Sequence, residues 1–309
     1  MTEARVRSMV PFMGWVFCLV LTGCAVTRPL PGPPLIRDAE RLNRRGVVDT
    51  DQQRFQAAEA SFADAYRLYG SVEEFGGMVT VLVNSSRLYR IRGEVDKAAQ
   101  AAARAGEMAH RVPHLAAEVW FELAKIRLLQ GDTDGAVTWS DKALHASTDA
   151  NRAMILNLQA DLFRLRGNLP RCVDLTGEAL KVSRTAADRH AEADALRILA
   201  DCQLAGNQPA AAAEAYGAAL QIHKSLAQPR QIHADLEGLS ASMERQGDRC
   251  AAGDYLLRAA DLAIARGDIP AASAHLGRAT ELCGDGDRGA AIRARMERLQ
   301  NRGVGGTSP

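Results

Sequence analysis

A short turn signal recurs along this chain at a nearly constant interval, and it restricts the fold more than any other feature. Each copy has a glycine, usually a polar residue, three further residues and a small residue, with glycines at Gly93, Gly131, Gly167, Gly206, Gly247 and Gly267. Glycine ends a helix in the left-handed conformation, and Asp or Asn caps the next helix. The first five glycines follow one another at a period of about 40 residues, which predicts a stacked array of helix pairs.

Composition agrees with an all-α fold. The segments between the turns are rich in Ala, Leu, Arg, Glu and Gln, which are strong helix formers, and no segment alternates polar and apolar residues as a strand would. Aromatic residues make up only 5% of the chain, so small side chains must provide much of the helix packing. The 38 basic and 37 acidic side chains nearly cancel, which argues against a nucleic-acid-binding protein.

The residues around the turns resemble those of the tetratricopeptide repeat. In the clearest copy, the large, small and glycine positions of that family are occupied by Trp120, Leu123, Ala124, Gly131, Ala136, Ala143 and Leu144. The copies at Gly93 and Gly206 are degenerate. The resemblance covers about residues 37–283 and implies a solenoid of helix pairs wound into a right-handed superhelix.

The ends of the array are expected to act as caps. Residues 53–69 form a predicted helix with a short partner at 36–46. At the other end, the spacing of the turn glycines falls to about half between Gly247, Gly267 and Gly286, which predicts single helices rather than pairs. A last helix is expected near residues 288–300.

The first residues have the arrangement of an export signal. Arg5 and Arg7 precede thirteen mostly apolar residues, a stretch too short for an ordinary membrane-spanning helix. The segment 21–24, Leu-Thr-Gly-Cys, then resembles the lipobox of bacterial lipoproteins. That resemblance implies cleavage after Gly23 and acylation of Cys24, and Ala25 implies sorting to the periplasmic face of the outer membrane. The alternative is a short apolar anchor or a buried helix in which the cysteine is incidental.

Four segments follow from these patterns. Residues 1–23 are the predicted signal peptide, and 24–36 form a lipidated linker that is rich in proline, which favours extended backbone. Residues 37–300 form the helical repeat domain, and 301–309 form a flexible tail.

No sequence motif points to catalysis or to a cofactor. Residues 284–289 match GxGxxG, but a helix is predicted before them where a dinucleotide site needs a strand. The seven histidines are scattered; His110 and His114 have a helical metal-ligand spacing, but Pro113 between them would break the helix. We therefore expect a protein that is not an enzyme and that has no cofactor and no metal.

The concave face of such an array, lined by the first helix of each pair, is its expected binding surface. Counting back from each turn places eleven residues there: Asn84, Arg87, Arg90, Glu118, Phe121, Lys125, Asn157, Asp161, Arg164, Arg197 and Asp201. Ordinary solvated helix surface is the alternative for each of them. The lysine clamp of the family's chaperone-binding members is absent, because Val83, Phe121 and Asn157 occupy its positions.

The leading hypothesis is a lipid-anchored cell-envelope scaffold or adaptor that binds a protein or peptide in this groove. Known tetratricopeptide lipoproteins assemble outer-membrane proteins, pili or secretins, or dock cell-wall enzymes. The alternative is an accessory lipoprotein that binds glycan or peptidoglycan, with Phe121 and Trp139 as its candidate stacking residues. We expect contact with the membrane only through the lipid, and no nucleic-acid partner.

Four cysteines lie within the predicted array. An exported protein sits in an oxidising compartment, where thiols can pair. Residues equidistant from the turn of an antiparallel helix pair lie side by side, so Cys172 is expected to pair with Cys202, and Cys250 with Cys283. Small buried thiols are the alternative.

Overall fold

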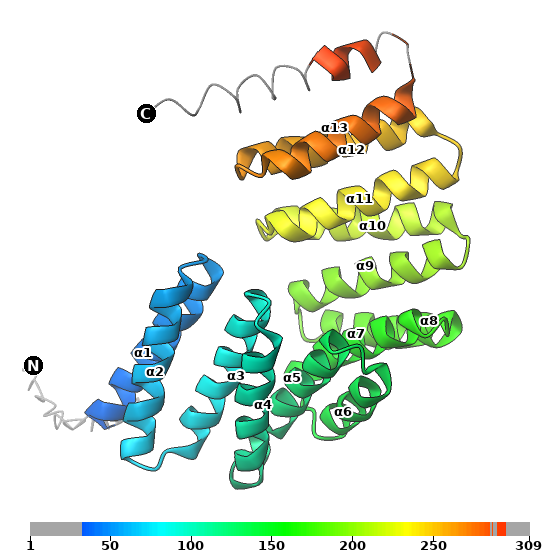
Figure 1. Cartoon of the computed structure of the whole chain (residues 1–309). Coiled ribbons are helices and arrows are strands. Elements are labelled where there is room, and N and C mark those ends of the chain that lie inside the picture. Colours follow the sequence, from blue (N-terminus) through cyan, green and yellow to red (C-terminus); the bar gives the residue numbers. More distant parts are fainter. Residues whose placement is uncertain (1–32, 285, 287–288, 295–309) are drawn as a thin grey trace, which may run out of the picture.

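The computed structural model describes residues 33–284, 286 and 289–294, and this part of the chain is entirely helical (Figure 1). The helices are α1 (Pro34–Asp51), α2 (Phe55–Ser71), α3 (Phe75–Ile91), α4 (Val95–Met108), α5 (Ala116–Leu129), α6 (Thr133–His145), α7 (Asp149–Leu165), α8 (Leu169–Thr185), α9 (Arg189–Ala205), α10 (Pro209–Ser225), α11 (Pro229–Arg245), α12 (Arg249–Ala265) and α13 (Ile269–Cys283). No helix among these combines the length and the apolar character that crossing a bilayer requires.

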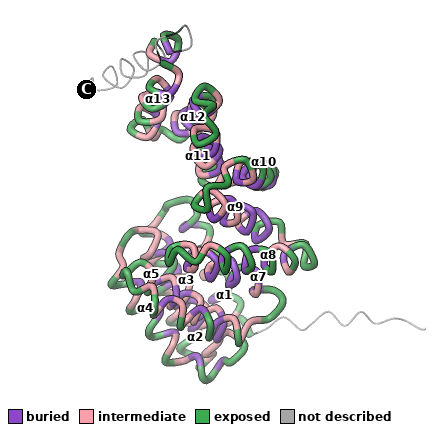
Figure 2. Tube along the Cα trace, turned by 90° about the vertical axis from the view of Figure 1, so that its right-hand side faces the viewer, coloured by how far each residue is buried: buried purple, intermediate pink, exposed green. Residues whose placement is uncertain are grey.

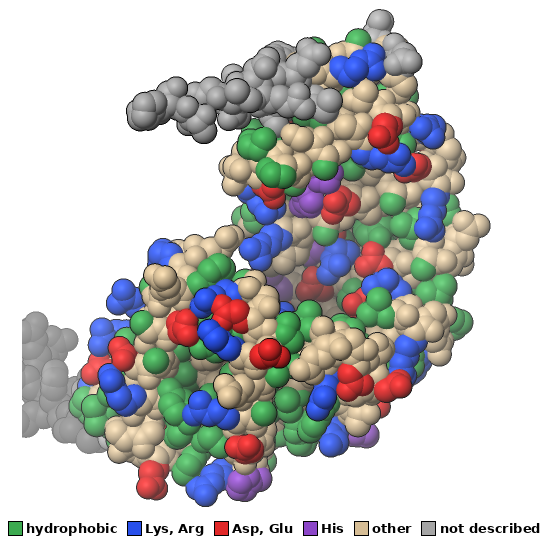
Figure 3. Space-filling view, viewed as in Figure 1, with side chains coloured by type: hydrophobic (Ala, Val, Ile, Leu, Met, Phe, Trp, Pro, Cys, Tyr) green, Lys and Arg blue, Asp and Glu red, His purple; other side chains and the backbone are tan. Residues whose placement is uncertain are grey.

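The helices form successive antiparallel pairs, from α1/α2 to α11/α12, and α13 continues the stack (Figure 1). The stack curves so that the α1–α4 end and the α11–α13 end turn toward the same side (Figure 1), and the space-filling view shows a hollow between them (Figure 3). The prediction of an all-α repeat solenoid is thereby confirmed. The expected signal peptide 1–23, the lipidation site Cys24 and the tail 301–309 lie outside the described residues.

The backbone conformation at the turns explains why turn glycines recur along the sequence, and why their spacing changes after Gly247. Gly93, Gly131, Gly167, Gly247 and Gly267 all have positive φ, as expected of helix-ending glycines. The same backbone position is held by a non-glycine residue in five other turns, at Gln53, Glu73, Ala187, Asn207 and Ala227. From Gly167 to Gly267 these positions are evenly spaced, at the same short interval that separates Gly247 from Gly267. Each shorter interval after Gly247 holds one helix, as expected: α12 between Gly247 and Gly267, and α13 after Gly267. The same interval runs from Gly167 onward, so these helices continue the regular pairing and do not mark a change in the array.

The boundaries also differ at the N-terminal end. Helix α1 begins at Pro34 and runs to Asp51, so it is longer than the 36–46 partner that we expected and takes in the end of the predicted linker. Proline is tolerated there because the first residues of a helix have no hydrogen-bond acceptor for their N–H groups. The predicted helix 53–69 corresponds to α2, Phe55–Ser71.

The array is interrupted between α4 and α5. Two short 3₁₀ segments, η1 (Ala109–Arg111) and η2 (Pro113–Leu115), replace the usual turn there. Helices α5 and α6 have 14 and 13 residues, whereas α7–α12 have 17 each. His110 and His114 lie in separate 3₁₀ segments, as the break at Pro113 predicted.

Small residues occupy the closest helix contacts. The fourth and eleventh residues of each second helix are buried, and five of the six helices place alanine at both: Ala58/Ala65, Ala98/Ala105, Ala136/Ala143, Ala212/Ala219 and Ala252/Ala259, each with 0% exposure. In α8 the two positions are Cys172 and Ala179. Figure 2 shows buried residues where helices face one another and exposed residues along the turns.

One of the two expected disulfides is present. Cys172 on α8 and Cys202 on α9 are bonded, with their α-carbons 6.4 Å apart. The pairing of Cys250 with Cys283 is not formed. Cys250 precedes the alanine position of α12 and its side chain is exposed, while the Cys283 sulfur lies 3.9 Å from the Cys250 carbonyl oxygen and packs beside Gly253.

Two neighbouring alanines of α10 give a direct test of the packing rule. Ala219 is fully buried against α9, whereas Ala218 is exposed. Ala219→Leu should lower the free energy of unfolding by about 1–3 kcal/mol, because the added carbons have no space. Ala218→Leu should change it by less than about 0.5 kcal/mol. Urea denaturation followed by circular dichroism measures both, and equal effects would contradict the packing rule.

Candidate functional site

The hollow of the array is walled by the odd-numbered helices. Successive odd-numbered helices from α1 to α11 contact one another, and within the described residues the even-numbered helices make no comparable contacts among themselves. The first helix of each pair therefore lies on the inner, shorter side of the curve, as the sequence predicted. Figure 3 shows this side hollowed, with basic, acidic and histidine side chains gathered along it.

Polar contacts join the first helices across the N-terminal half of this inner face. The Asn84 amide nitrogen donates to Asn43 Oδ1 at 3.0 Å, linking α3 to α1. Arg87 of α3 donates to Asp51 of α1 at 3.3 Å. Arg90 Nε donates to Glu122 Oε1 of α5 at 3.1 Å. Each contact spans two helix pairs, so these side chains brace the curve.

The same pattern continues toward α9. The Asn151 amide of α7 donates to Glu118 Oε1 of α5 at 2.9 Å, and the Asn157 amide donates to the Ala191 carbonyl oxygen of α9 at 2.9 Å. Arg164 pairs with Asp161 one turn earlier on α7, at 2.7 Å. These contacts satisfy the amide donors of Asn151 and Asn157, whereas Glu118 Oε2 and Asn157 Oδ1 are buried without a hydrogen-bond partner among the described residues.

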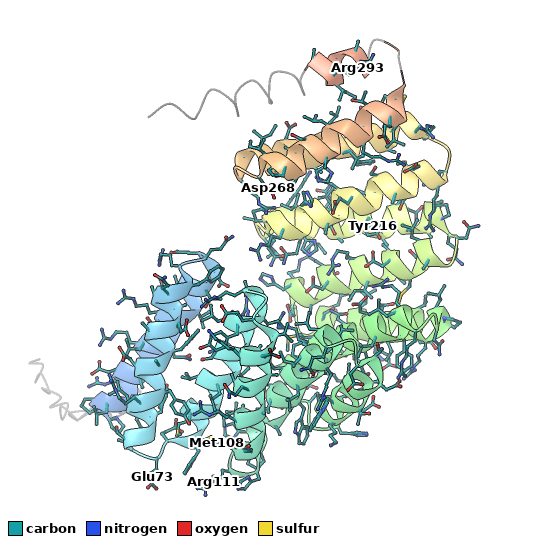
Figure 4. The ribbon with its side chains drawn as sticks, in the orientation of Figure 1. Glu73, Met108, Arg111, Tyr216, Asp268 and Arg293 are labelled. Carbon is teal, nitrogen blue, oxygen red and sulfur yellow. A yellow bond between two sulfur atoms is a disulfide. The ribbon has the colours of Figure 1, made fainter. Side chains whose placement is uncertain are left out.

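The polar face extends along α9. Arg197 lies 3.7 Å from Asp194 and 3.9 Å from Asp201. Tyr216 of α10, labelled in Figure 4, donates a hydrogen bond to Asp201. Burial raises the pKa of the Asp201 carboxyl, although the Tyr216 hydroxyl and the arginines Arg197 and Arg164 oppose this.

Lys125 is the exception in this network. Within the described residues its amine makes no ion pair or hydrogen bond, and it lies 4.7 Å from the ring centre of Phe121, one turn earlier on α5. Burial lowers its pKa to about 8, with Arg90 and Arg87 adding to the effect and Glu122 and Asp194 opposing it. A half-buried cation next to an aromatic ring, with no anion of its own, is suited to bind a carboxylate.

The structure thus brings the eleven predicted groove residues to the first helices of the inner face, but most of them bond to neighbouring residues of the array. Contact between any of them and a partner stays a prediction.

A buried charge pair behind this face was missed by the sequence analysis. His223 of α10 and Asp235 of α11 are both fully buried, with Nδ1 and Oδ2 2.6 Å apart. His223 Nε2 lies 3.7 Å from Asp194 of α9. Burial alone would lower the pKa of His223, but the negative charges of Asp194 and Asp235 and the hydrogen bond to Asp235 together raise it to about 9. His223 lies on the second helix of its pair, whereas the predicted groove residues all lie on first helices.

The His223 imidazolium gives the fold a defined pH dependence. Because the folded pKa is about 9 and the ordinary value 6.5, this stabilisation should be complete below pH 6.5 and be lost as the pH rises through 9. His223→Gln keeps a hydrogen-bond donor for Asp235 without the charge. The difference in unfolding free energy between wild type and variant should therefore shrink over this range. A difference that does not change with pH, measured by urea denaturation, would contradict the assignment.

The two expected glycan-stacking residues do not form one platform. Phe121 lies on α5, where Lys125 covers one face of its ring. Trp139 lies on α6, the second helix of that pair, and the Lys142 amine lies 4.3 Å from its ring centre. Two aromatic rings do meet in one place, a cleft of about 420 Å³ between α2, α3 and α4 that Tyr66 and Tyr89 line. There Arg104 and Lys97 lie over the two rings, at 5.0 and 5.5 Å.

No protein-family model matches the chain, and no curated protein matches it. Several solved structures share its fold. The signal-transduction ATPase with a tetratricopeptide repeat sensor from Pyrococcus horikoshii superposes with a TM-score of 0.65 at 15% identity, over 86% of this chain. The chain spans only 42% of that protein's length.

Two shorter proteins are matched over most of their length. The apo form of RapI gives a TM-score of 0.58 at 15% identity, over 72% of this chain and 84% of that one. PilW, a type IV pilus biogenesis factor, gives 0.54 at 16% identity, over 71% and 91%. These similarities show a tetratricopeptide-like helical repeat fold.

Proposed function

We propose that this protein is a lipid-anchored scaffold or adaptor of the cell envelope, which binds a protein or peptide partner on its inner face. It acts by binding and not by catalysis. The lipid on Cys24 holds it at the periplasmic face of the outer membrane. The Cys172–Cys202 disulfide supports export, because such bonds persist in oxidising compartments. The fold supports partner binding, because repeat solenoids use their concave surfaces for this purpose.

The observation that carries this proposal is the unpaired amine of Lys125 beside Phe121. The other charged residues predicted for the groove have partners within the array, so a ligand that bound them would first have to displace those partners. Lys125 has none to displace. The partner therefore presents a carboxylate that bonds to Lys125. An apolar side chain that follows this carboxylate packs on Phe121.

A scaffold of this kind fits a role in assembling outer-membrane proteins, pili or secretins, or in docking a cell-wall enzyme. PilW, which shares the fold, is itself a type IV pilus biogenesis factor. The alternative is a glycan- or peptidoglycan-binding accessory lipoprotein, for which the tyrosine-lined cleft between α2, α3 and α4 offers the aromatic rings.

Removing the charge of Lys125 should weaken partner binding. Lys125→Met keeps the unbranched stem, so we expect the fold to survive and affinity to fall about tenfold or more, as for the loss of a charge-assisted hydrogen bond. The partner is captured from detergent-solubilised envelope with wild-type protein and then titrated. Because the pKa of Lys125 is about 8, wild-type affinity should fall as the pH rises past that value, and Lys125→Arg should abolish this fall.

Lys224→Met is the matched control, because Lys224 is exposed on α10. Its affinity should equal that of wild type. Equal capture by wild type, Lys125→Met and Lys224→Met would show that the partner binds elsewhere. Binding of peptidoglycan fragments in place of a protein would favour the glycan alternative.

Lipidation of Cys24 is tested separately. Cys24→Ser should leave an uncleaved precursor without lipid, which no longer fractionates with the membrane as the mature form does. Intact-mass analysis of wild-type protein should show a diacylated chain that begins at Cys24. An unmodified wild-type N-terminus starting at Met1 would refute the anchor.

A further inference from the structure

Three side chains that commonly bind metals meet near the C-terminal end of the array. His233 and Glu237 lie one turn apart on α11, and His275 comes from α13. Each offers one ligating atom within 4.8 Å of the other two. The imidazoles are 19% and 12% exposed, and the carboxylate is 48% exposed. The cluster is thus walled by two helices and open on one side.

The cluster lies on the wall of the hollow. Helix α11 is the first helix of the last described pair, and α13 follows that pair in the stack. Figure 3 shows histidine and acidic side chains together on the wall of the hollow. Asp268, labelled in Figure 4, caps α13 by accepting a hydrogen bond from the Ala271 N–H. Its negative charge acts on His275 and adds to that of Glu237.

The distances suit a small cation. The two Nε2 atoms of His233 and His275 point at one another, 2.8 Å apart, with the ring planes at 58°. Glu237 Oε1 lies 3.8 Å from His275 Nε2. Its other oxygen, Oε2, lies 3.3 Å from His233 Nδ1, the ring nitrogen that points away from His275, so this contact orients the His233 ring and is not a spacing between two ligands. Ligand atoms at 2.0–2.1 Å from a tetrahedral ion are separated by about 3.3 Å. The 2.8 and 3.8 Å spacings lie on both sides of this value, and no two of the three ligand atoms are more than 4.8 Å apart. Side-chain shifts of about 1–1.5 Å would complete the site.

We propose that His233, His275 and Glu237 form a binding site for a divalent transition-metal ion, Zn²⁺ in the first place, with one coordination position left open to the hollow. Two imidazoles and one carboxylate are a donor set that zinc accepts, whereas Mg²⁺ and Ca²⁺ prefer oxygen ligands alone. The ligands project from α11 and α13, which both pack on α12, so little conformational freedom is lost on binding. The open position is filled by water or by a side chain of a bound partner.

Zinc titration of the untagged, chelator-stripped protein tests this site without reference to any partner. The background variant is Cys250→Ser, which removes an exposed thiol that could itself bind zinc. We expect one equivalent of Zn²⁺ per chain in a competition assay, and with Co²⁺ the strong visible absorption of a four-coordinate ion. His275→Ala should lower the affinity at least about 100-fold, beyond what loss of an outer-sphere contact costs.

Two further variants keep the test decisive. Glu237→Gln preserves side-chain size at a partly exposed position, so it should fold normally and still bind zinc about tenfold more weakly or worse. His145→Ala removes an exposed histidine of α6 and should leave binding unchanged. Zinc should raise the thermal midpoint of the background protein and of His145→Ala equally, that of Glu237→Gln by less, and that of His275→Ala least of all. No saturable binding, or binding that survives both His275→Ala and Glu237→Gln, would overturn the proposal.

Discussion

Close contact at two alanine positions of each second helix is the constraint on which this solenoid depends. Packed helix axes lie about 8–10 Å apart, and small side chains at the crossing permit the lower end of that range. With only 5% aromatic residues in the chain, the stack relies on such contacts rather than on large core residues. Cys172 takes one of these positions, which brings its α-carbon to 6.4 Å from that of Cys202. Cys250 does not, and no bond to Cys283 forms.

Stacking of the pairs curves the array, and the curvature brings polar side chains of neighbouring first helices into contact on the inner face. The odd-numbered helices contact one another on the short side of the curve, so their polar side chains are crowded together. Most are satisfied across helices, as in the bonds from Arg90 to Glu122 and from Asn157 to the Ala191 carbonyl. Most charged side chains predicted for this face are therefore already paired within the array, whereas the Lys125 amine makes no ion pair or hydrogen bond among the described residues, which is why we propose it as the contact for a partner.

The sequence predicted the fold class because glycine at the end of a helix leaves a visible signal. It concealed half of the turns, since Ala187 and Ala227 hold the same left-handed backbone without glycine. Pro113 predicted that no helix would run through His110 and His114, but the sequence did not predict the two 3₁₀ segments η1 and η2 that separate α4 from α5. Counting from the turns placed the groove residues on the correct helices, but their mutual bonds depend on how successive pairs are stacked, which spacing alone does not give. His233 and His275 are separated by one repeat interval, and only the alignment of successive repeats would have suggested their contact.

The most direct test of this account is the pKa of the Lys125 amine in the free protein. Isotope-edited NMR of the lysine side chains, assigned with Lys125→Met, would follow its titration without any partner. The account predicts a value near 8, because the amine is desolvated on the inner face and has no carboxylate bonded to it. A value near the ordinary 10.5 would mean that the amine is solvated or already paired, and would contradict its role as the open contact of the groove.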